Sequence, residues 1–137
     1  MPGKRSRDKG KVGERELANV LRRYGYDAHR GVQYHGGSDS PDVVGLPDVH
    51  IEVKRVERLQ LYDALEQSRH DSDDNEFPVV MHRKNRKEWV VIQPLDDWIK
   101  LYEGAEELYR QPREKAEFSL PGFLKGLLEK LRGSRLV

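Results

Sequence analysis

The chain contains no cysteine among its 137 residues, which excludes a disulfide framework, a thiol nucleophile and a cysteine-ligated zinc or iron–sulfur site. It also lacks any run of roughly 18 apolar residues, so we expect no transmembrane helix. No apolar segment follows the charged opening stretch MPGKRSRDKGKVGER, and this order does not fit a signal peptide. We therefore expect a soluble, intracellular protein, and the chain length suits one domain.

Apolar residues are scarce, because they make up 36% of the chain while charged residues make up another 36%. This composition fits either a disordered chain or a small domain with a heavily charged surface. The net charge of +1 conceals segregation: basic residues gather in 1–15, 82–88 and 110–137, and acidic residues in 62–76 and 95–107. Such segregation favours a polyanionic partner, although a solvated surface with basic tails has the same signature.

The pattern of apolar residues predicts an α/β fold. Helical periodicity appears at 11–25, 59–70, 95–110 and, in a shorter form, 121–132. Strand-like segments occupy 26–34, 42–45, 49–56, 78–83 and 89–93. Three successive strands predict an antiparallel meander, and the helix that follows permits a crossover to a parallel strand. We expect a mixed central β-sheet of about five strands flanked by helices, and the apolar side of the second helix is expected to carry Leu61, Tyr62, Leu65 and Arg69.

The most specific pattern is Pro41-Asp42 followed, further along, by Glu52-Val53-Lys54. Glu52 and Lys54 are two residues apart on a strand, so both project from one face. A hairpin between the two segments would bring Asp42 beside Glu52, where two carboxylates can bind one hard cation such as Mg²⁺ or Mn²⁺. A neighbouring lysine can orient a water molecule and stabilise charge at phosphorus. Together these residues predict a phosphodiester hydrolase.

A third carboxylate would come from the first helix, on which Glu14 and Glu16 both flank the apolar stripe. At roughly 100° per residue, Glu14 lies about 70° from the centre of the stripe and Glu16 about 90° on the other side. Helix geometry therefore does not decide which of the two glutamates supplies the third carboxylate. Asp48 also follows a proline, but it lies on the same strand as Glu52 at a distance of about 13 Å, too far to share a metal.

Each motif also has a simpler interpretation. A Glu and a Lys two residues apart on a strand often form a solvent-facing ion pair. His50 and His82 are more often packing or surface residues than ligands. Gln67 either reaches the site or is plainly exposed, and the second is the commoner case. The basic stretch at 83–87 is either a set of phosphate contacts or a solvated turn, and we favour DNA contact.

The segments GERELANVLRRYGY, SPDVVG and HIEVKR resemble the PD-(D/E)XK nuclease superfamily in their order and spacing. Within it, the chain is similar to the archaeal-type Holliday junction resolvases and their phage-borne relatives, over about residues 10–100. The resemblance implies a restriction-endonuclease-like core and a metal-dependent endonuclease that acts as a homodimer on branched DNA, the four-way junction. It implies Mg²⁺ as the cofactor, with Mn²⁺ as a substitute.

Carried over residue by residue, the resemblance implies catalytic roles for Glu14, Asp42, Glu52 and Lys54. It implies metal contacts from Asp42, Glu52, the main-chain carbonyl of Val53 and, through water, Glu14. The family also uses a serine before the aspartate, so Ser38 and Ser40 are candidates. Glu16 is then expected to be a solvent-side charge. The side chains expected to contact DNA are Lys4, Arg5, Arg7, Lys9, Lys11, Arg30, Ser38, Ser40, Arg55, Arg83, Lys84 and Arg86.

We therefore expect a basic N-terminal arm at 1–10, a nuclease domain at 11–104 and a helical C-terminal tail at 105–137. The leading function is a structure-specific endonuclease that resolves four-way junctions by paired symmetric nicks. It would act in the cytoplasm, on nucleoid or phage DNA of a prokaryotic host. The alternatives are another duplex or repair nuclease of the same superfamily, and an inactive DNA-binding protein on the same scaffold.

Overall fold

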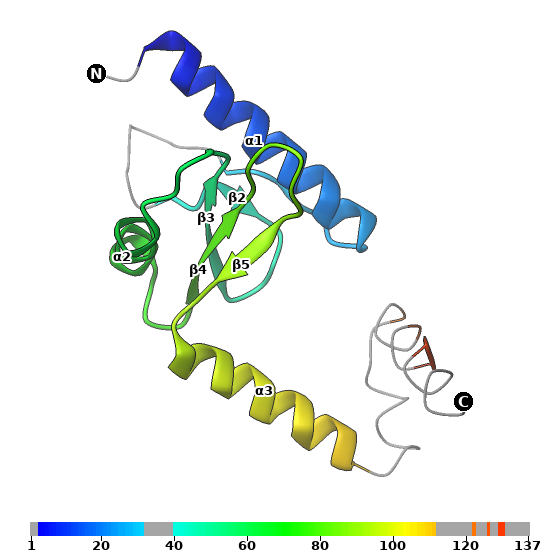
Figure 1. Ribbon diagram of the computed structural model, residues 1–137. Coiled ribbons are helices and arrows are strands. Elements are labelled where there is room, and N and C mark those ends of the chain that lie inside the picture. The colour runs from blue at the N-terminus through cyan, green and yellow to red at the C-terminus, as the bar shows by residue number, and fades with distance from the viewer. Residues whose placement is uncertain (1–2, 32–39, 112–121, 123–125, 127–128, 131–137) are drawn as a thin grey trace. The chain divides into compact units, whose positions relative to one another are not determined.

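The computed structural model describes residues 3–31, 40–111, 122, 126, 129 and 130. The chain divides into two units, one ending at Asp97 and one beginning at Trp98, and the first contains the β-sheet (Figure 1). Its elements are α1 (Lys4–Arg23), β1 (His29–Arg30), β2 (Val43–Val44), β3 (Val49–Lys54), α2 (Leu61–Asp71), β4 (Phe77–His82) and β5 (Val90–Ile92). Helix α3 spans Leu95–Arg110. Within the described residues, no helix has both the length and the apolar character that crossing a bilayer requires.

The sheet has five strands in the order β1-β2-β3-β4-β5. Strand β1 pairs antiparallel with β2, and β2 pairs antiparallel with β3, as the predicted meander requires. Strand β4 lies parallel to β3, with Ile51 opposite Val79 and Glu52 opposite Val80, and β5 returns antiparallel to β4. Helix α2 makes the crossover between the two parallel strands. The predicted mixed α/β fold is therefore confirmed.

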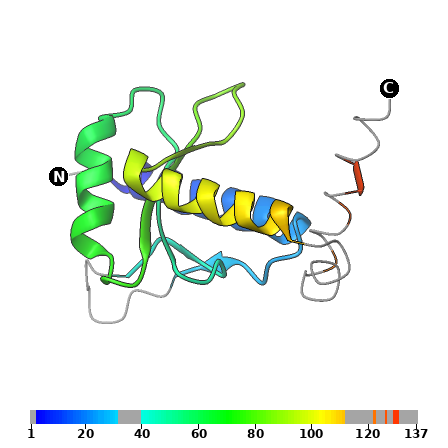
Figure 2. The same ribbon diagram turned by 90° about the horizontal axis from the view of Figure 1, so that it is seen from below.

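Two separate cores cover the two faces of the sheet. On one face, α1 contributes Leu17, Ala18 and Leu21, which cluster with strand residues including Val43 and Ile51. On the other face, α2 forms a smaller cluster made of Ala64, Leu65 and Val80. Helix α2 is seen end-on in Figure 1 and along its length in Figure 2. The first unit thus has three layers, in which the sheet lies between α1 and α2.

Strand β3 is the central strand of the sheet and is buried on both faces. Its apolar residues Ile51 and Val53 belong to the cluster under α1. Its polar residues alternate with them and face the other way, so His50 and Glu52 are also buried, with exposed fractions of 1% and 5%. The alternation predicted from sequence is confirmed, but the polar face is covered by α2 and does not face solvent.

The covered face of α2 differs from the one expected. Its buried residues are Ala64, Leu65, Ser68 and Asp71, whereas Tyr62 is 83% exposed. Small side chains let the helix approach the sheet, and the Ser68 hydroxyl donates to main-chain carbonyls of both β3 and β4, lying 3.3 Å from His50 O and 3.1 Å from Val79 O. The expected apolar side was therefore wrong except for Leu65, because close approach and hydrogen bonding outweigh apolar size at this position.

Element boundaries also differ from those expected. Helix α1 begins at Lys4, so residues 4–10, expected as a basic arm, form its first turns. The strand expected at 26–34 is formed by His29–Arg30, and residues 32–39 lie outside the described part of the chain. The short helix expected at 121–132 falls largely outside it as well.

Two glycines permit close approaches around the sheet. Gly45 follows β2 with φ +122°, and an added Cβ there would lie 2.5 Å from the carbonyl oxygen of Asp27. Gly13 lies within α1, and an added Cβ there would lie 2.5 Å from the Cβ of Arg55, just after β3. Gly13 therefore marks the point where α1 comes closest to the end of β3.

Candidate active site

Asp42 and Glu52 are brought together by the pairing of β2 with β3. Val43 lies opposite Ile51, and the Asp42 N–H donates to the Ile51 carbonyl at 2.9 Å. The Asp42 side chain continues along the strand, where its Oδ2 accepts a hydrogen bond from the Val53 N–H at 2.9 Å. The main chain of the strand that carries Glu52 thus fixes the Asp42 carboxylate, as the predicted hairpin requires.

Burial raises the pKa of both carboxyl groups. Burial raises the pKa of Asp42, the Val53 N–H lowers it, the charge of Glu14 raises it and that of Lys54 lowers it. Burial and then the charge of Asp42 raise the pKa of Glu52 to about 7, against the opposing effect of Lys54. A buried and a partly buried carboxylate that lie together, each with a raised pKa, are a donor set that a hard divalent cation neutralises. The residues present therefore fit a Mg²⁺ or Mn²⁺ ion.

Lys54 projects from the same face of β3 as Glu52. Its Nζ lies 3.4 Å from Glu52 Oε1 and 3.4 Å from Gln67 Oε1. Gln67 is exposed, as expected, but it also orients the Lys54 ammonium group from α2. The ammonium group is therefore held beside the carboxylates, where it can also contact a water molecule or a phosphate oxygen.

Glu14 and Glu16 point to different partners. Glu14 Oε2 lies 2.7 Å from Arg30 Nε, and after burial the Glu14 charge is a further cause that raises the pKa of Asp42. Glu16 forms ion pairs with Arg83 and, at 3.5 Å, with Arg55 Nε. The expectation that Glu16 is a solvent-side charge is wrong, because Arg55 and Arg83 approach it from parts of the chain distant in sequence.

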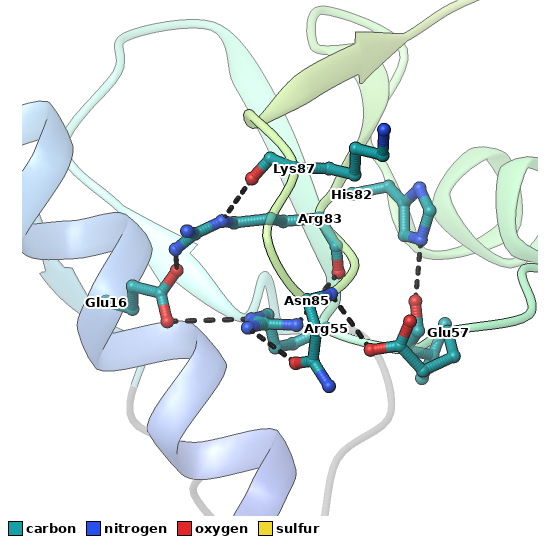
Figure 3. Close-up of polar contacts among 8 residues, drawn as sticks. Glu16, Arg55, Glu57, His82, Arg83, Asn85 and Lys87 are labelled. Carbon is teal, nitrogen blue, oxygen red and sulfur yellow. Dashed lines mark hydrogen bonds and ion pairs between the residues drawn. The ribbon is translucent and has the colours of Figure 1, made fainter.

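The loop between β4 and β5 is joined to α1 by these ion pairs (Figure 3). Arg83 Nε donates to the Lys87 carbonyl at 2.5 Å, and Arg55 Nη2 donates to Asn85 Oδ1 at 3.1 Å. The Asn85 N–H in turn donates to Glu57 Oε1 at 2.8 Å. We call Glu16, Arg55 and Arg83 the arginine cluster. It positions a basic loop whose outermost side chains, including Lys84 and Arg86, are exposed.

The other residues expected to contact DNA are distributed over several places. Lys4, Lys9 and Lys11 are exposed on the first turns of α1, and Ser40 is partly buried just before Pro41. Arg30 forms an ion pair with Glu14. The side chains of Arg5 and Arg7, and all of Ser38, lie outside the described part of the chain.

Two further residues with ligand chemistry lie beside Glu52. The sequence-based interpretation considered His50 as a ligand but favoured a packing or surface role, and it did not consider Asp71. His50, Glu52 and Asp71 offer ligand atoms that all lie within 4.8 Å of one another. A signal for Asp71 was present in the sequence, since it follows Ala64 and Ser68 at helical spacing on the covered face of α2. His50 lies two residues before Glu52, and therefore on the same face of β3.

Comparison with family models assigns the chain to a known family. The family model for the archaeal Holliday junction resolvase (Hjc) matches residues 5–107. Among solved structures, the chain is similar to Hjc of Archaeoglobus fulgidus, a Holliday junction resolvase from an archaeal hyperthermophile, with 26% identity and a TM-score of 0.48. That match covers 62% of this chain and 72% of the other. No curated protein matches the sequence. Because the family model spans most of the chain, the protein belongs to the archaeal Holliday junction resolvase family.

Proposed function

We propose that this protein is a metal-dependent endonuclease that resolves four-way DNA junctions by hydrolysing one phosphodiester bond in each of two symmetry-related strands. The observation that carries the proposal is the enclosed pair of Asp42 and Glu52, whose pKa values are both raised and whose positions are fixed by one strand. Family membership supports the junction as the substrate.

Each residue of the candidate active site has its own proposed role. Asp42 and Glu52 would hold Mg²⁺, and Glu14 would support it through water. When bound, the ion supplies positive charge that polarises a phosphate oxygen and makes a water molecule more acidic. The Val53 carbonyl is also a candidate ligand, because the N–H and C=O of one strand residue point to the same side and its N–H already faces Asp42. Lys54 would orient the attacking water and stabilise the negative charge that develops at phosphorus.

A homodimer fits the requirement for two nicks related by two-fold symmetry. The described part of α3 supports this proposal, because none of its residues is buried and it exposes apolar side chains. Leu95, Trp98 and Tyr102 are 71%, 47% and 49% exposed, and the rings of Trp98 and Tyr102 stack with their centroids 5.3 Å apart. Apolar side chains gathered in this way commonly mark an interface between proteins. Sedimentation of wild type and of Trp98→Glu tests whether α3 joins two copies.

The basic loop and the first turns of α1 would bind the phosphate backbone. Lys84, Arg86, Lys4 and Lys9 are exposed and carry charge that phosphates attract. The alternatives from the same scaffold are a nuclease for ordinary duplex DNA and an inactive DNA-binding protein. The retention of Asp42, Glu52 and Lys54 in one place argues against the inactive protein.

The decisive experiment compares a four-way junction with the linear duplexes that form its arms. We expect Mg²⁺-dependent nicks at symmetric positions in the junction, no comparable cleavage of the arms, and no cleavage when a chelator is present. Equal cleavage of the junction and its arms would show that the protein is a nuclease for ordinary duplex DNA and not a resolvase. Junction binding without cleavage at any Mg²⁺ or Mn²⁺ concentration would favour the inactive scaffold.

A further inference from the structure

A second group of ligand-type side chains lies on the α2 side of β3. One ring nitrogen of His50 and carboxylate oxygens of Glu52 and Asp71 lie within 4.8 Å of one another. The three side chains are almost enclosed, with exposed fractions of 1%, 6% and 5%. Acidic groups on a surface often come together without a ligand, but this group lies inside the first unit and includes an imidazole.

An unpaired nitrogen of His50 provides a second, independent observation. Its Nε2 is buried and has no hydrogen-bond partner among the residues that the structure describes. Buried polar atoms almost always have a partner, so an orphan nitrogen needs an explanation. An unpaired nitrogen on an imidazole ring that lies next to two carboxylates is explained if the ring and both carboxylates bind one cation.

The other ring nitrogen of His50 faces a carboxylate, although the two atoms are too far apart for a hydrogen bond. His50 Nδ1 lies 3.8 Å from Glu76 Oε1, and that oxygen is itself held by the Asp73 N–H at 2.9 Å. A metal-bound histidine usually directs its second ring nitrogen toward a carboxylate or carbonyl, which favours the proton there. Glu76 therefore favours a proton on Nδ1 and leaves the lone pair on Nε2.

We propose that His50, Glu52 and Asp71 form a binding site for a divalent transition-metal ion, separate from the Mg²⁺ position at Asp42 but sharing Glu52 with it. Mixed imidazole and carboxylate ligands suit Mn²⁺ or Zn²⁺ better than Mg²⁺, which prefers oxygen ligands alone. Three protein ligands leave at least one coordination position to water. Because the three side chains are almost fully buried, the ion would have a structural role and would not bind substrate.

The ion would join two elements and position a residue of the active site. His50 and Glu52 lie on β3, and Asp71 is the last residue of α2. A cation between Glu52 and Asp71 also removes part of the repulsion that acts on Glu52, whose pKa is raised by burial, by Asp42 and, to a smaller extent, by Asp71. The proposal does not depend on the DNA substrate, since the ion would bind equally well in a protein that cleaves no junction.

The test uses Mn²⁺ as the probe, because pulsed electron paramagnetic resonance detects an imidazole nitrogen bound to it. The proposed Mg²⁺ position contains oxygen ligands alone, so nitrogen coupling reports on the new site. We expect this coupling in wild type and in Asp42→Asn, in which the first site has lost a ligand. The coupling should disappear in Asp42→Asn/His50→Leu.

Equilibrium titration of Mn²⁺ measures the same site by affinity. In the Asp42→Asn background, we expect His50→Leu and Asp71→Asn each to raise the Kd for Mn²⁺ at least tenfold. The matched control is His82→Leu, which removes an imidazole whose Nε2 lies 2.9 Å from the Val56 carbonyl and which does not belong to the group. That control should change the Kd by less than about threefold, which is below 0.7 kcal/mol.

The outcomes separate this proposal from the proposed function. An absence of nitrogen coupling in wild type overturns the site, whatever the variants do and whether or not they fold. Coupling that survives His50→Leu in a folded protein, as judged by circular dichroism, also overturns it. Junction cleavage by wild type in Mg²⁺ alone tests the proposed function, and its result leaves the Mn²⁺ spectrum unaffected.

Discussion

Carboxylates outnumber cations around Glu52, whereas guanidinium groups outnumber carboxylates around Glu16. In the first region, Glu52 is buried and Asp42 partly buried, the charge of Lys54 acts on both, and burial raises the pKa of both carboxyls. In the second, Arg55 and Arg83 share the single carboxylate of Glu16. The first region therefore fits the cation that we propose it binds, and the second has a net positive charge that would attract phosphate.

The two regions also differ in how they are held. The acidic region is built on the main chain of β3, through the Val53 N–H and the pairing of β2 with β3. The arginine cluster depends on side chains that join three segments, with Glu16 and Arg83 separated by 67 positions. We therefore expect substitutions in the acidic region to affect chemistry, and substitutions in the cluster to affect DNA binding.

The largest expected effect separates chemistry from binding. Asp42→Asn and Glu52→Gln should each reduce junction cleavage below about 2% of the wild-type rate, which corresponds to about 2.3 kcal/mol in barrier height. Junction affinity should stay the same or rise, because a carboxylate that repels phosphate has been removed. Single-turnover cleavage and binding without divalent ions measure the two effects. If either variant cleaves the junction at more than about 2% of the wild-type rate, the substituted residue is not a metal ligand.

The next effect concerns stability without metal. The pKa of Glu52 is raised from 4.5 to about 7, chiefly by burial and by Asp42, so the folded chain keeps a proton that the unfolded chain releases. The free energy of unfolding should therefore fall as pH rises from about 4.5 to about 7, by about 2 kcal/mol after allowance for solvent screening.

Urea unfolding in the presence of a chelator measures this fall. Glu52→Gln should flatten it, since the amide does not titrate in this range. Saturating Mg²⁺ should restore stability near pH 7, because the ion binds the ionised carboxylates of the folded chain. Stability that rises across this pH window in wild type would contradict the enclosed pair.

A smaller effect distinguishes the two glutamates of α1. Glu14→Gln should lower the cleavage rate at saturating Mg²⁺ at least tenfold, about 1.4 kcal/mol, because Glu14 is proposed to support the metal ion through water. The cleavage rate of Glu16→Gln should stay within a factor of about three of the wild-type rate, about 0.7 kcal/mol, because the Glu16 carboxylate forms ion pairs with Arg55 and Arg83. The reverse ranking would move the third carboxylate of the active site to Glu16.

The salt dependence of junction binding tests the basic loop. Lys84→Ala and Arg86→Ala should each reduce the slope of log K against log salt by roughly 0.9, the value for one lost phosphate contact. Arg83→Ala should reduce it less, because Glu16 already neutralises part of that charge. If the slope stays unchanged when Arg83, Lys84 and Arg86 are all replaced, the loop is a solvated turn.

The sequence predicted the features that depend on strand periodicity. The two-residue alternation of β3 placed Glu52 and Lys54 on one face, and a short hairpin was enough to bring Asp42 beside them. These relations are local, since they follow from the pleat and from one turn. For the same reason, the mixed sheet and the crossover by α2 could be predicted from the order of the segments.

The sequence did not predict relations that depend on how a helix lies on the sheet. The partners of Glu16 come from the segment after β3 and from the loop after β4, and no spacing within α1 indicates them. The covered side of α2 was also missed, because Ala64 and Ser68 permit a closer approach than Tyr62 does. With that face wrong, Asp71 was not recognised as a neighbour of Glu52.

Gly13 has a consequence for anyone who wishes to make this protein more heat-resistant. Replacing glycines inside helices with alanine is a common route to stability, worth roughly 0.5–1 kcal/mol for each exposed position. Gly10 has open space around it, so Gly10→Ala should raise the melting temperature. An alanine at Gly13 would meet the Cβ of Arg55 at 2.5 Å and push α1, with Glu14 and Glu16, away from β3. Thermal unfolding of the two single variants should therefore shift in opposite directions, and an engineer should leave Gly13 unchanged.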